Sequence, residues 1–359
     1  MSGDVLGRGA TRAPLALASL VALGSLVVAA LAACSPAPDP TPTTATEAPA
    51  VARPMPAEVP APAPVAFAPL RGTIVDSASP AHPSIAVKID DHEAARPQIG
   101  LNRADIVFEE LVEGGLTRYA AVWHSDVPDE VGPVRSIRPM DPDIVVPFGG
   151  LVAYSGGQEQ FVSMMQDTPI VNLVFDYDDT GLFHRADDRP SPHDVILAAR
   201  EAVDRHVDLA PPAAQFAYGS TDPLAPAGFA AQPTGRIDLV FSEERFPSWE
   251  WDVPSATWLR SQEGAPDHEA SGERLRATNV VALRVEIDWS YGDVPRTVLV
   301  GSGEAWVSAA GRTAHGSWSK ASREAPIVLT AADGSPLRLA PGTTWVELVP
   351  TDGSVTFTP

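Results

Sequence analysis

The sequence predicts an α/β or α+β N-terminal domain with a central mixed sheet, followed by a small, mainly antiparallel β domain. In residues 70–210, apolar runs of strand length alternate with stretches in which apolar residues recur at helical spacing. In residues 234–359, short β-rich runs are separated by glycine-containing turns, a pattern typical of antiparallel hairpins. Residues 211–233 begin with two prolines and are predicted to link the two domains.

The elements of the first half follow from their apolar patterns. Ser191 as an N-cap and Pro192 at the first helical position predict a helix over residues 191–207. Helical spacing of apolar residues predicts another helix over residues 158–166. The carboxylate-rich run at residues 103–112 is either a short helix or a strand. The predicted strands are residues 85–89, 119–123, 151–154 and 170–175.

The second half contains only strand signals. Trp306, Trp318 and Trp345 lie at strand spacing, and we interpret them as core residues because β-sheets favour aromatic side chains. The predicted strands are residues 237–241, 249–259, 279–287, 297–300, 304–309, 316–320, 327–330, 344–348 and 355–358.

The N-terminus carries the pattern of a bacterial lipoprotein signal. An aliphatic run at residues 15–33 follows two arginines, which is the layout of a secretory signal peptide. The run ends in Leu31-Ala32-Ala33-Cys34, which matches a lipobox, and Cys34 is the only cysteine in the chain. We therefore predict a signal peptide over residues 1–33, lipidation of Cys34, and an extracytoplasmic protein anchored to the membrane by its lipid. The alternative is a membrane-spanning helix that is not removed.

Residues 34–69 are rich in proline, alanine and threonine and contain almost no large apolar residue. Such a segment cannot bury enough surface to offset the chain entropy that folding removes. We predict a disordered spacer that is extended where its prolines adopt polyproline II geometry. The folded part is expected to begin near Leu70.

The charge balance limits the classes of partner. The chain has 25 lysines and arginines against 46 aspartates and glutamates, and its formal net charge is -21. This excess of negative charge argues against nucleic acid and against an anionic lipid surface as general partners. A local group of arginines is therefore informative.

Such a group lies in a proline-bounded loop. Arg135 and Arg138 are three residues apart, and Arg118 lies beside the preceding predicted strand. Because proline fixes φ and removes a donor, the loop is expected to be rigid, and rigid guanidinium groups can bind a carboxylate or a phosphate. We predict that these arginines and Asp141 contribute to an anion-binding site. The alternative is that the arginines form ordinary ion pairs with nearby acidic residues.

A second group of polar residues is predicted to contribute to the same site. His184 and Arg185 precede His193, which lies at a predicted helix start, where first-turn amides and the helix dipole favour an anion. Both histidines could also transfer protons, because imidazole titrates near neutrality. Asp90 and Asp91 follow the first predicted strand, where α/β sheets place ligands, and a solvated turn is the alternative there.

One further pattern is typical of serine hydrolases. Ser155, in Ala153-Tyr154-Ser155-Gly156-Gly157, lies between a predicted strand and a predicted helix, as in a nucleophile elbow. The domain is too short for that fold, and no oxyanion-loop motif precedes the serine. We do not favour this interpretation.

Motifs across nearly the whole chain after the spacer carry a family resemblance. In the first half they are Ala86-Val87-Lys88-Ile89-Asp90-Asp91, Ala104-Asp105-Ile106-Val107-Phe108-Glu109-Glu110, Gly115-Leu116-Thr117-Arg118-Tyr119, Gly132-Pro133-Val134-Arg135-Ser136-Ile137-Arg138, Phe183-His184-Arg185 and Pro192-His193. In the second half they are Thr278-Asn279-Val280-Val281, Gly316-Ser317-Trp318-Ser319-Lys320 and Pro341-Gly342-Thr343-Thr344-Trp345-Val346-Glu347-Leu348-Val349-Pro350.

These motifs resemble those of the YerB-like lipoproteins of Gram-positive bacteria, whose two halves are classed as a domain of unknown function, DUF3048. The resemblance implies a secreted, lipid-anchored protein in two parts and supplies no activity. The chain departs from the family pattern at Asp194, where members often have asparagine after the histidine that aligns with His193.

The sequence therefore predicts a membrane-anchored extracytoplasmic lipoprotein that binds an anionic cell-envelope ligand, with no cofactor and no metal. The first alternative is an envelope hydrolase or transferase that uses the same site, with Asp90, Asp91 or Asp141 as a base or metal ligand. The second alternative is an accessory factor that binds a protein partner through the β domain.

Overall fold

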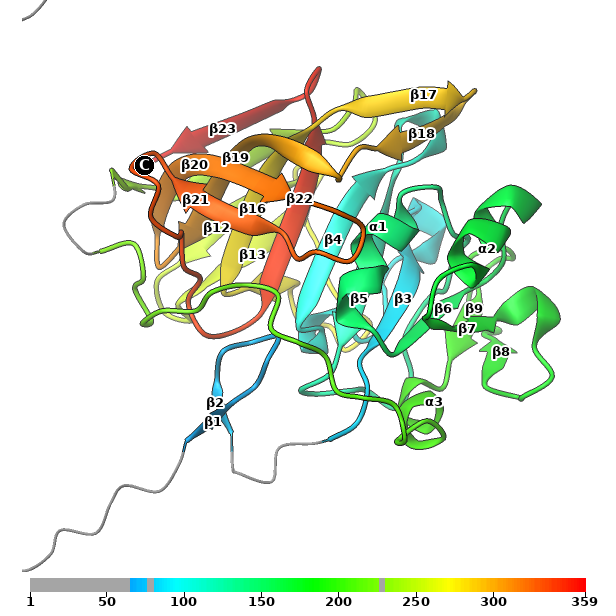
Figure 1. Cartoon of the computed structure of the whole chain (residues 1–359). Helices are drawn as coiled ribbons and strands as arrows, with labels where there is room; N and C mark the ends of the chain where they lie inside the picture. Colours follow the sequence, from blue (N-terminus) through cyan, green and yellow to red (C-terminus); the bar gives the residue numbers. More distant parts are fainter. Residues whose placement is uncertain (1–64, 76–80, 226–229) are drawn as a thin grey trace, which may run out of the picture. The chain divides into compact units, whose positions relative to one another are not determined.

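The computed structural model describes residues 65–75, 81–225 and 230–359. The predicted signal peptide, Cys34 and nearly all of the predicted spacer lie outside these residues. Within the described residues, 11 strands form one mixed sheet (Figure 1). In spatial order they are β10 (Gln232–Pro233), β20 (Arg312–Lys320), β19 (Gly301–Ala309), β16 (Asn279–Val285), β22 (Thr344–Pro350), β4 (Ile106–Leu111), β5 (Thr117–Trp123), β3 (Ile85–Asp90), β6 (Leu151–Tyr154) and β7 (Val171–Val174), with β21 (Val328–Ala331) paired to β20.

Strand β22 joins the two halves of the chain. It pairs in parallel with β16 of the second half on one side and with β4 of the first half on the other. The second half is otherwise built from antiparallel pairs, as predicted. The two sequence regions therefore share a single sheet instead of forming two separate ones.

A second, six-stranded sheet covers one face of the central strands. Its Trp249 and Trp258 lie in one buried cluster with Val107 and Tyr119 of the large sheet. Between the two sheets, the ring of Trp249 packs against that of Trp345 of the large sheet, with 5.2 Å between centroids. Its strands are β14 (Ala265–Pro266), β13 (Thr257–Gln262), β12 (Ser248–Asp252), β11 (Arg236–Val240) and β23 (Ser354–Thr358), with β15 (Arg276–Ala277) paired to β13.

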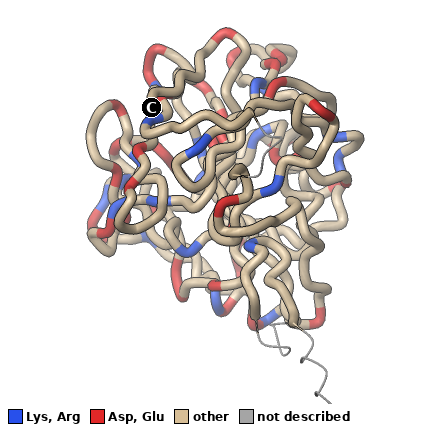
Figure 2. Tube along the Cα trace, turned by 90° about the vertical axis from the view of Figure 1, so that its left-hand side faces the viewer, with Lys and Arg blue, Asp and Glu red and all other residues tan. Residues whose placement is uncertain are grey.

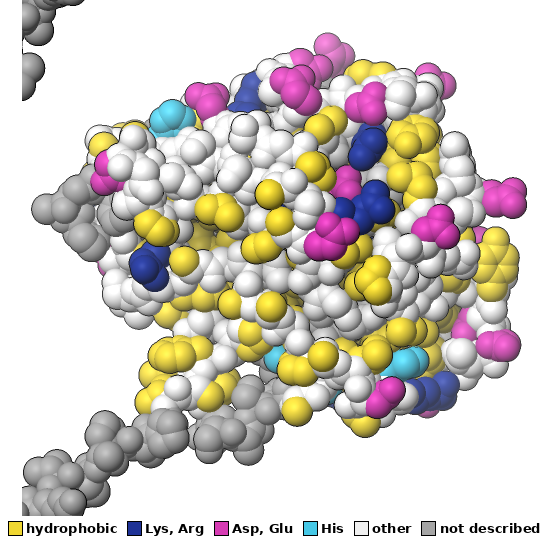
Figure 3. Space-filling view, in the orientation of Figure 1, with side chains coloured by type: hydrophobic (Ala, Val, Ile, Leu, Met, Phe, Trp, Pro, Cys, Tyr) yellow, Lys and Arg dark blue, Asp and Glu magenta, His cyan; other side chains and the backbone are white. Residues whose placement is uncertain are grey.

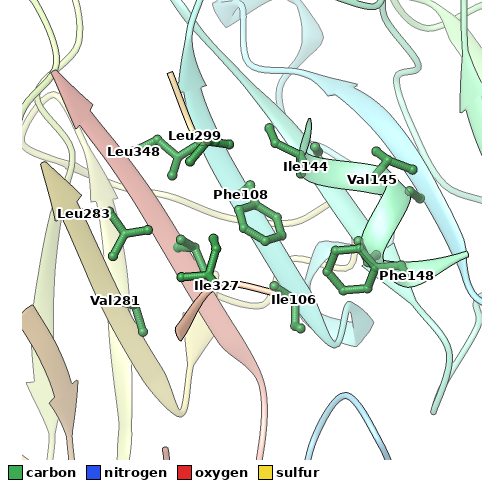
Figure 4. Packing of buried hydrophobic residues seen from close by; sticks show 14 of the residues in the cluster. Ile106, Phe108, Ile144, Val145, Phe148, Val281, Leu283, Leu299, Ile327 and Leu348 are labelled. Carbon is green, nitrogen blue, oxygen red and sulfur yellow. The ribbon is translucent and has the colours of Figure 1, made fainter. Parts of the chain in front are cut away.

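Two short helices cover the opposite face of the large sheet. Helices α1 (Asp141–Val145) and α2 (Glu159–Gln166) lie over its first-half strands (Figure 1). Figure 4 shows Ile144 and Phe148 directed toward Phe108 of β4, with Leu348 of β22 in the same cluster. The helix α3 (Ala199–Asp204) buries its apolar residues in the other cluster.

Three two-stranded ribbons complete the fold. They are β1 (Ala66–Phe67) with β2 (Ile74–Val75), β8 (Phe183–Arg185) with β9 (Val195–Leu197), and β17 (Ile287–Tyr291) with β18 (Val294–Thr297).

The structure corrects several local predictions. The predicted helix over residues 191–207 is wrong in its first part, because Val195–Leu197 is a buried strand that pairs with β8, and only Ala199–Asp204 is helical. The ambiguous run at 103–112 is the strand β4. The ordered chain begins before Leu70, since Ala66–Phe67 already pairs with β2.

The predicted linker is packed against the core. Phe216 and Leu224 are buried in the cluster beneath α1 and α2, and Gln232–Pro233 pairs with β20 at the edge of the large sheet. The described residues of this segment therefore pack against the large sheet.

Charged residues of both signs are mixed over the fold. Figure 2 shows acidic and basic positions interspersed along the trace, and the face seen in Figure 3 carries both in small groups. Among the residues described, no helix is long and apolar enough to cross a membrane. An ionic site must therefore be sought in local groupings of side chains.

Candidate functional site

The loop that carries Arg135 and Arg138 lies between the ends of β3 and β6. The amide of Asp90 donates to the carbonyl of Pro133, and the amide of Arg135 donates to the carbonyl of Lys88, at 2.9 and 2.8 Å. On the other side, the amide of Ser155 donates to the carbonyl of Arg135 at 3.0 Å. The loop is thus hydrogen-bonded to β3 on one side and to the residue that follows β6 on the other.

Arg118 lies on β5, directly opposite Asp90 of β3 and Glu110 of β4. It is 8% exposed, and its Nη1 donates to the carbonyl of Ser136 at 3.0 Å. In the part of the chain that the structure describes, no carboxylate lies within ion-pairing distance of its guanidinium. Arg118 is therefore a buried cation without a direct counterion.

The electrostatic surroundings of Arg118 are unfavourable to its charge. Burial lowers the pKa of Arg118, the positive charges of Arg138 and Arg135 lower it further, and Asp90 and Glu113 oppose them, so that the pKa is about 10. At neutral pH the guanidinium is still protonated. The site holds a positive charge that an anion would stabilise.

The other two arginines do have carboxylate partners. The Nε of Arg135 lies 3.2 Å from the Oδ2 of Asp90. The Nε of Arg138 donates to Glu113 at 2.7 Å, and its Nη1 donates to the carbonyl of Ile137 at 2.8 Å. These two pairs give Arg135 and Arg138 carboxylate partners, while the charges of both arginines still act on Arg118.

Asp90 also binds a histidine from a distant part of the chain. The Nδ1 of His193, in the loop between β8 and β9, lies 2.6 Å from the Oδ2 of Asp90. The ring of His193 stacks on that of His92, with 4.4 Å between centroids. The amide of His92 donates to the other oxygen of Asp90 at 3.2 Å. An aspartate–histidine pair therefore adjoins the three arginines.

A buried ionic triad lies below these residues. Lys88, on the same face of β3 as Asp90, is fully buried and contacts Glu110, and its Nζ lies 2.7 Å from Asp141. Asp141 also accepts a hydrogen bond from the amide of Arg138 at 2.6 Å. Burial, and then the charge of Asp141, raise the pKa of Glu110 to about 7. Asp141, which was predicted for the site, thus binds the arginine loop through the amide of Arg138.

Three of the residues predicted for the site lie elsewhere. Asp91 is on the opposite face of the sheet, where Tyr119 donates to it at 2.6 Å. His184 is 51% exposed and lies 3.8 Å from Glu130. Arg185 pairs with Asp194 at 2.6 Å. The structure brings together Arg118, Arg135, Arg138, Asp90, Asp141 and His193 only.

Three residues of this cluster were not predicted as site members: Lys88, Glu110 and Glu113. A signal for Lys88 was present, because it is two residues before Asp90 in a strand, and alternate residues share a face. The position of Glu110 depends on register, which sets it opposite Arg118. The sequence pattern alone does not specify that register.

The serine hydrolase arrangement is not assembled. The Oγ of Ser155 lies 3.4 Å from the Oγ of Ser136. Within the described residues, no hydrogen bond joins Ser155 to His184 or to His193. No group of three or more metal-ligating side chains was found in the same residues.

A second ionic network lies between the two sheets. Arg260 is fully buried, and it pairs with Asp267 and, at 2.7 Å, with Glu109. Glu347 accepts a hydrogen bond from the indole of Trp249 at 2.7 Å. Because these groups are buried between the two sheets, we infer that they contribute to packing specificity and not to ligand binding.

Comparison with known proteins places the chain in a family. Residues 70–208 match the N-terminal domain, and residues 237–346 the C-terminal domain, of a protein of unknown function, DUF3048. The chain belongs to this family, which confirms the resemblance noted in its sequence.

The chain is similar to the YerB protein of Bacillus subtilis in both sequence and structure. "Putative lipoprotein YerB" of strain 168 is 27% identical over 302 residues, which cover 79% of this chain and 86% of that protein. The crystal structure of YerB protein from Bacillus subtilis superposes with a TM-score of 0.70 at 23% identity, and the match covers 81% of this chain and 99% of that one. This second match supports the fold.

Proposed function

We propose that this protein is an extracytoplasmic, lipid-anchored protein that binds an anionic group of a cell-envelope component at the Arg118 site. The observation that carries the proposal is the guanidinium of Arg118, which is buried, has no carboxylate partner among the described residues and lies near two further arginines. A buried charge without a counterion destabilises the folded protein, and charged groups in such unfavourable positions cluster at functional sites.

The proposed location rests on two further observations. The chain carries the sequence Leu31-Ala32-Ala33-Cys34 after an aliphatic run, and the relative bears the name "Putative lipoprotein YerB". An anchored protein meets envelope polymers and lipid headgroups, many of which carry phosphate or carboxylate groups. Binding of a protein partner through the β-rich half stays a prediction.

The experiment measures anion binding by the full-length chain. Isothermal titration calorimetry with inorganic phosphate is performed on the wild type and on Arg118→Met, in a buffer whose only other small anion is chloride. We expect the variant to bind phosphate at least about tenfold more weakly, because a charge-assisted hydrogen bond contributes about 1.5–3 kcal/mol.

Arg185→Met is the matched control. Arg185 is also an arginine on a strand of the first half, but it is half-exposed and already pairs with Asp194. Its replacement should leave phosphate binding unchanged. Equal affinities for the wild type and Arg118→Met, or no binding by the wild type, would contradict the proposal.

A further inference from the structure

The Asp90–His193 pair supplies a proton-transfer group that anion binding alone does not need. We infer that the ligand of the Arg118 site is a phosphodiester, and that His193 takes the proton from the water molecule that hydrolyses it. This inference rests on the proposed anion binding and assigns a reaction to the same site.

The hydrogen bond to Asp90 sets the chemistry of the imidazole. When the Nδ1–H of a histidine donates to a carboxylate, the Nε2 carries the free lone pair and can accept a proton. The distance from the Nδ1 of His193 to Asp90 is 2.6 Å. No hydrogen bond from the described residues reaches its Nε2. The stacked ring of His92 holds one face of the imidazole in place.

The other acidic groups of the site are poor bases because each is already occupied. Asp90 is bound by the histidine and by Arg135. Asp141 and Glu110 are fully buried, and both contact Lys88. Partial burial raises the pKa of Glu113, but its hydrogen bond to an arginine and the charge of that arginine outweigh burial and hold the pKa below its ordinary value. These contacts argue against the aspartates that the sequence suggested as bases, and they favour His193.

The unpaired guanidinium of Arg118 indicates the class of ligand. Arg135 and Arg138 pair with Asp90 and Glu113. Lys88 contacts both Glu110 and Asp141. Among the described residues of the site, Arg118 is thus the guanidinium without a carboxylate within ion-pairing distance. A phosphodiester carries one negative charge and has two unesterified oxygens that accept hydrogen bonds from guanidinium groups. A carboxylate has the same charge but contains no ester bond for a base to help cleave.

The step balances as an ordinary hydrolysis. The oxygen of water forms a bond to phosphorus while one of its protons moves to the Nε2 of His193. The bond from phosphorus to one ester oxygen breaks, and that oxygen leaves with the electron pair and takes a proton from solvent. His193 then returns its proton to solvent. One water is consumed, and the products are a phosphomonoester and an alcohol. The arginines stabilise the charge on the phosphoryl oxygens in the transition state.

The test uses the full-length protein and bis(p-nitrophenyl) phosphate, with release of p-nitrophenol as the readout. We expect His193→Ala to lower kcat by about 10²–10⁴-fold, which is the range of general base catalysis. Inhibition by inorganic phosphate should change less than about twofold, because the arginines are retained. Added imidazole should restore part of the turnover to this variant, an effect that a purely structural histidine would not show.

His184→Ala is the matched control, because His184 is exposed and lies outside the site. Its turnover should equal that of the wild type. If the wild type binds bis(p-nitrophenyl) phosphate in calorimetry but releases no more product than His193→Ala, the hydrolysis is refuted and the anion site stands. If His184→Ala loses as much turnover as His193→Ala, the assignment of the base is refuted. If the wild type binds neither this diester nor inorganic phosphate, the proposed function fails as well.

Discussion

Replacing Arg118 with methionine should make the protein more stable, although it weakens anion binding. The structure lowers the pKa of this arginine to about 10 from an ordinary value above 12. At about 1.4 kcal/mol per pH unit, the protonated group destabilises the folded protein by about 3 kcal/mol at neutral pH. Linkage gives the sign of this effect on stability. Because the pKa of Arg118 is lower in the folded state than in the unfolded chain, protonation destabilises the folded protein, and the full penalty is present at pH values below about 10.

The variant also loses the hydrogen bond from Arg118 to the carbonyl of Ser136. A hydrogen bond from a charged donor contributes about 1.5–3 kcal/mol in general, and the smaller value suits a single contact of ordinary length. The expected net gain is therefore about 1–2 kcal/mol. For a cooperative unit of this size, such a gain corresponds to a rise in Tm of about 2–3 °C.

The assay is thermal unfolding followed by circular dichroism at pH 7, in chloride buffer without phosphate. Arg138→Met is the contrasting variant, because Arg138 has a carboxylate partner and its removal leaves Glu113 unpaired. We expect this second variant to lower Tm. A fall in Tm for Arg118→Met would show that its charge is needed by the fold, and it would refute the reasoning that places a ligand there.

Two further predictions concern pH and location. The pKa of Glu110 is raised to about 7, so the stability that its protonated form contributes is complete below about pH 4.5 and is lost as the pH rises through about 7. In urea titrations, Glu110→Gln should flatten the fall in stability across this pH window. An unchanged pH dependence would contradict the assignment. Cys34 is the predicted lipidation site, so cells grown with radiolabelled palmitate should label the wild type and leave Cys34→Ser unlabelled, whereas a wild type without label would refute the anchor.

Local patterns predicted many of the elements. The continuous apolar run near Ile85 is a strand because it is buried on both faces, and the helical spacing around Phe161 is borne out by α2. The predicted helix at Ser191 failed because capping signals describe only the local chain. Val195–Leu197 pairs instead with β8, and the tertiary pairing outweighs the local preference.

The candidate site was predictable in part. Arg118, Arg135 and Arg138 were noticed because they form a local group of arginines in an acidic chain and prolines flank the loop. The meeting of His193 with Asp90 joins residues that are 103 positions apart, and no spacing rule covers such a distance. Asp91 was wrongly placed for a related reason, since adjacent residues at the end of a strand point to opposite faces of the sheet.

The position of β22 has a consequence for how the chain is made. This strand lies between β16 and β4, although its residues follow both of them in the sequence. The strands on either side of β22 can therefore form one sheet only when residues 344–350 are in place. A truncation shortly before Thr344 would expose two hydrogen-bonding edges at once, one on β16 and one on β4.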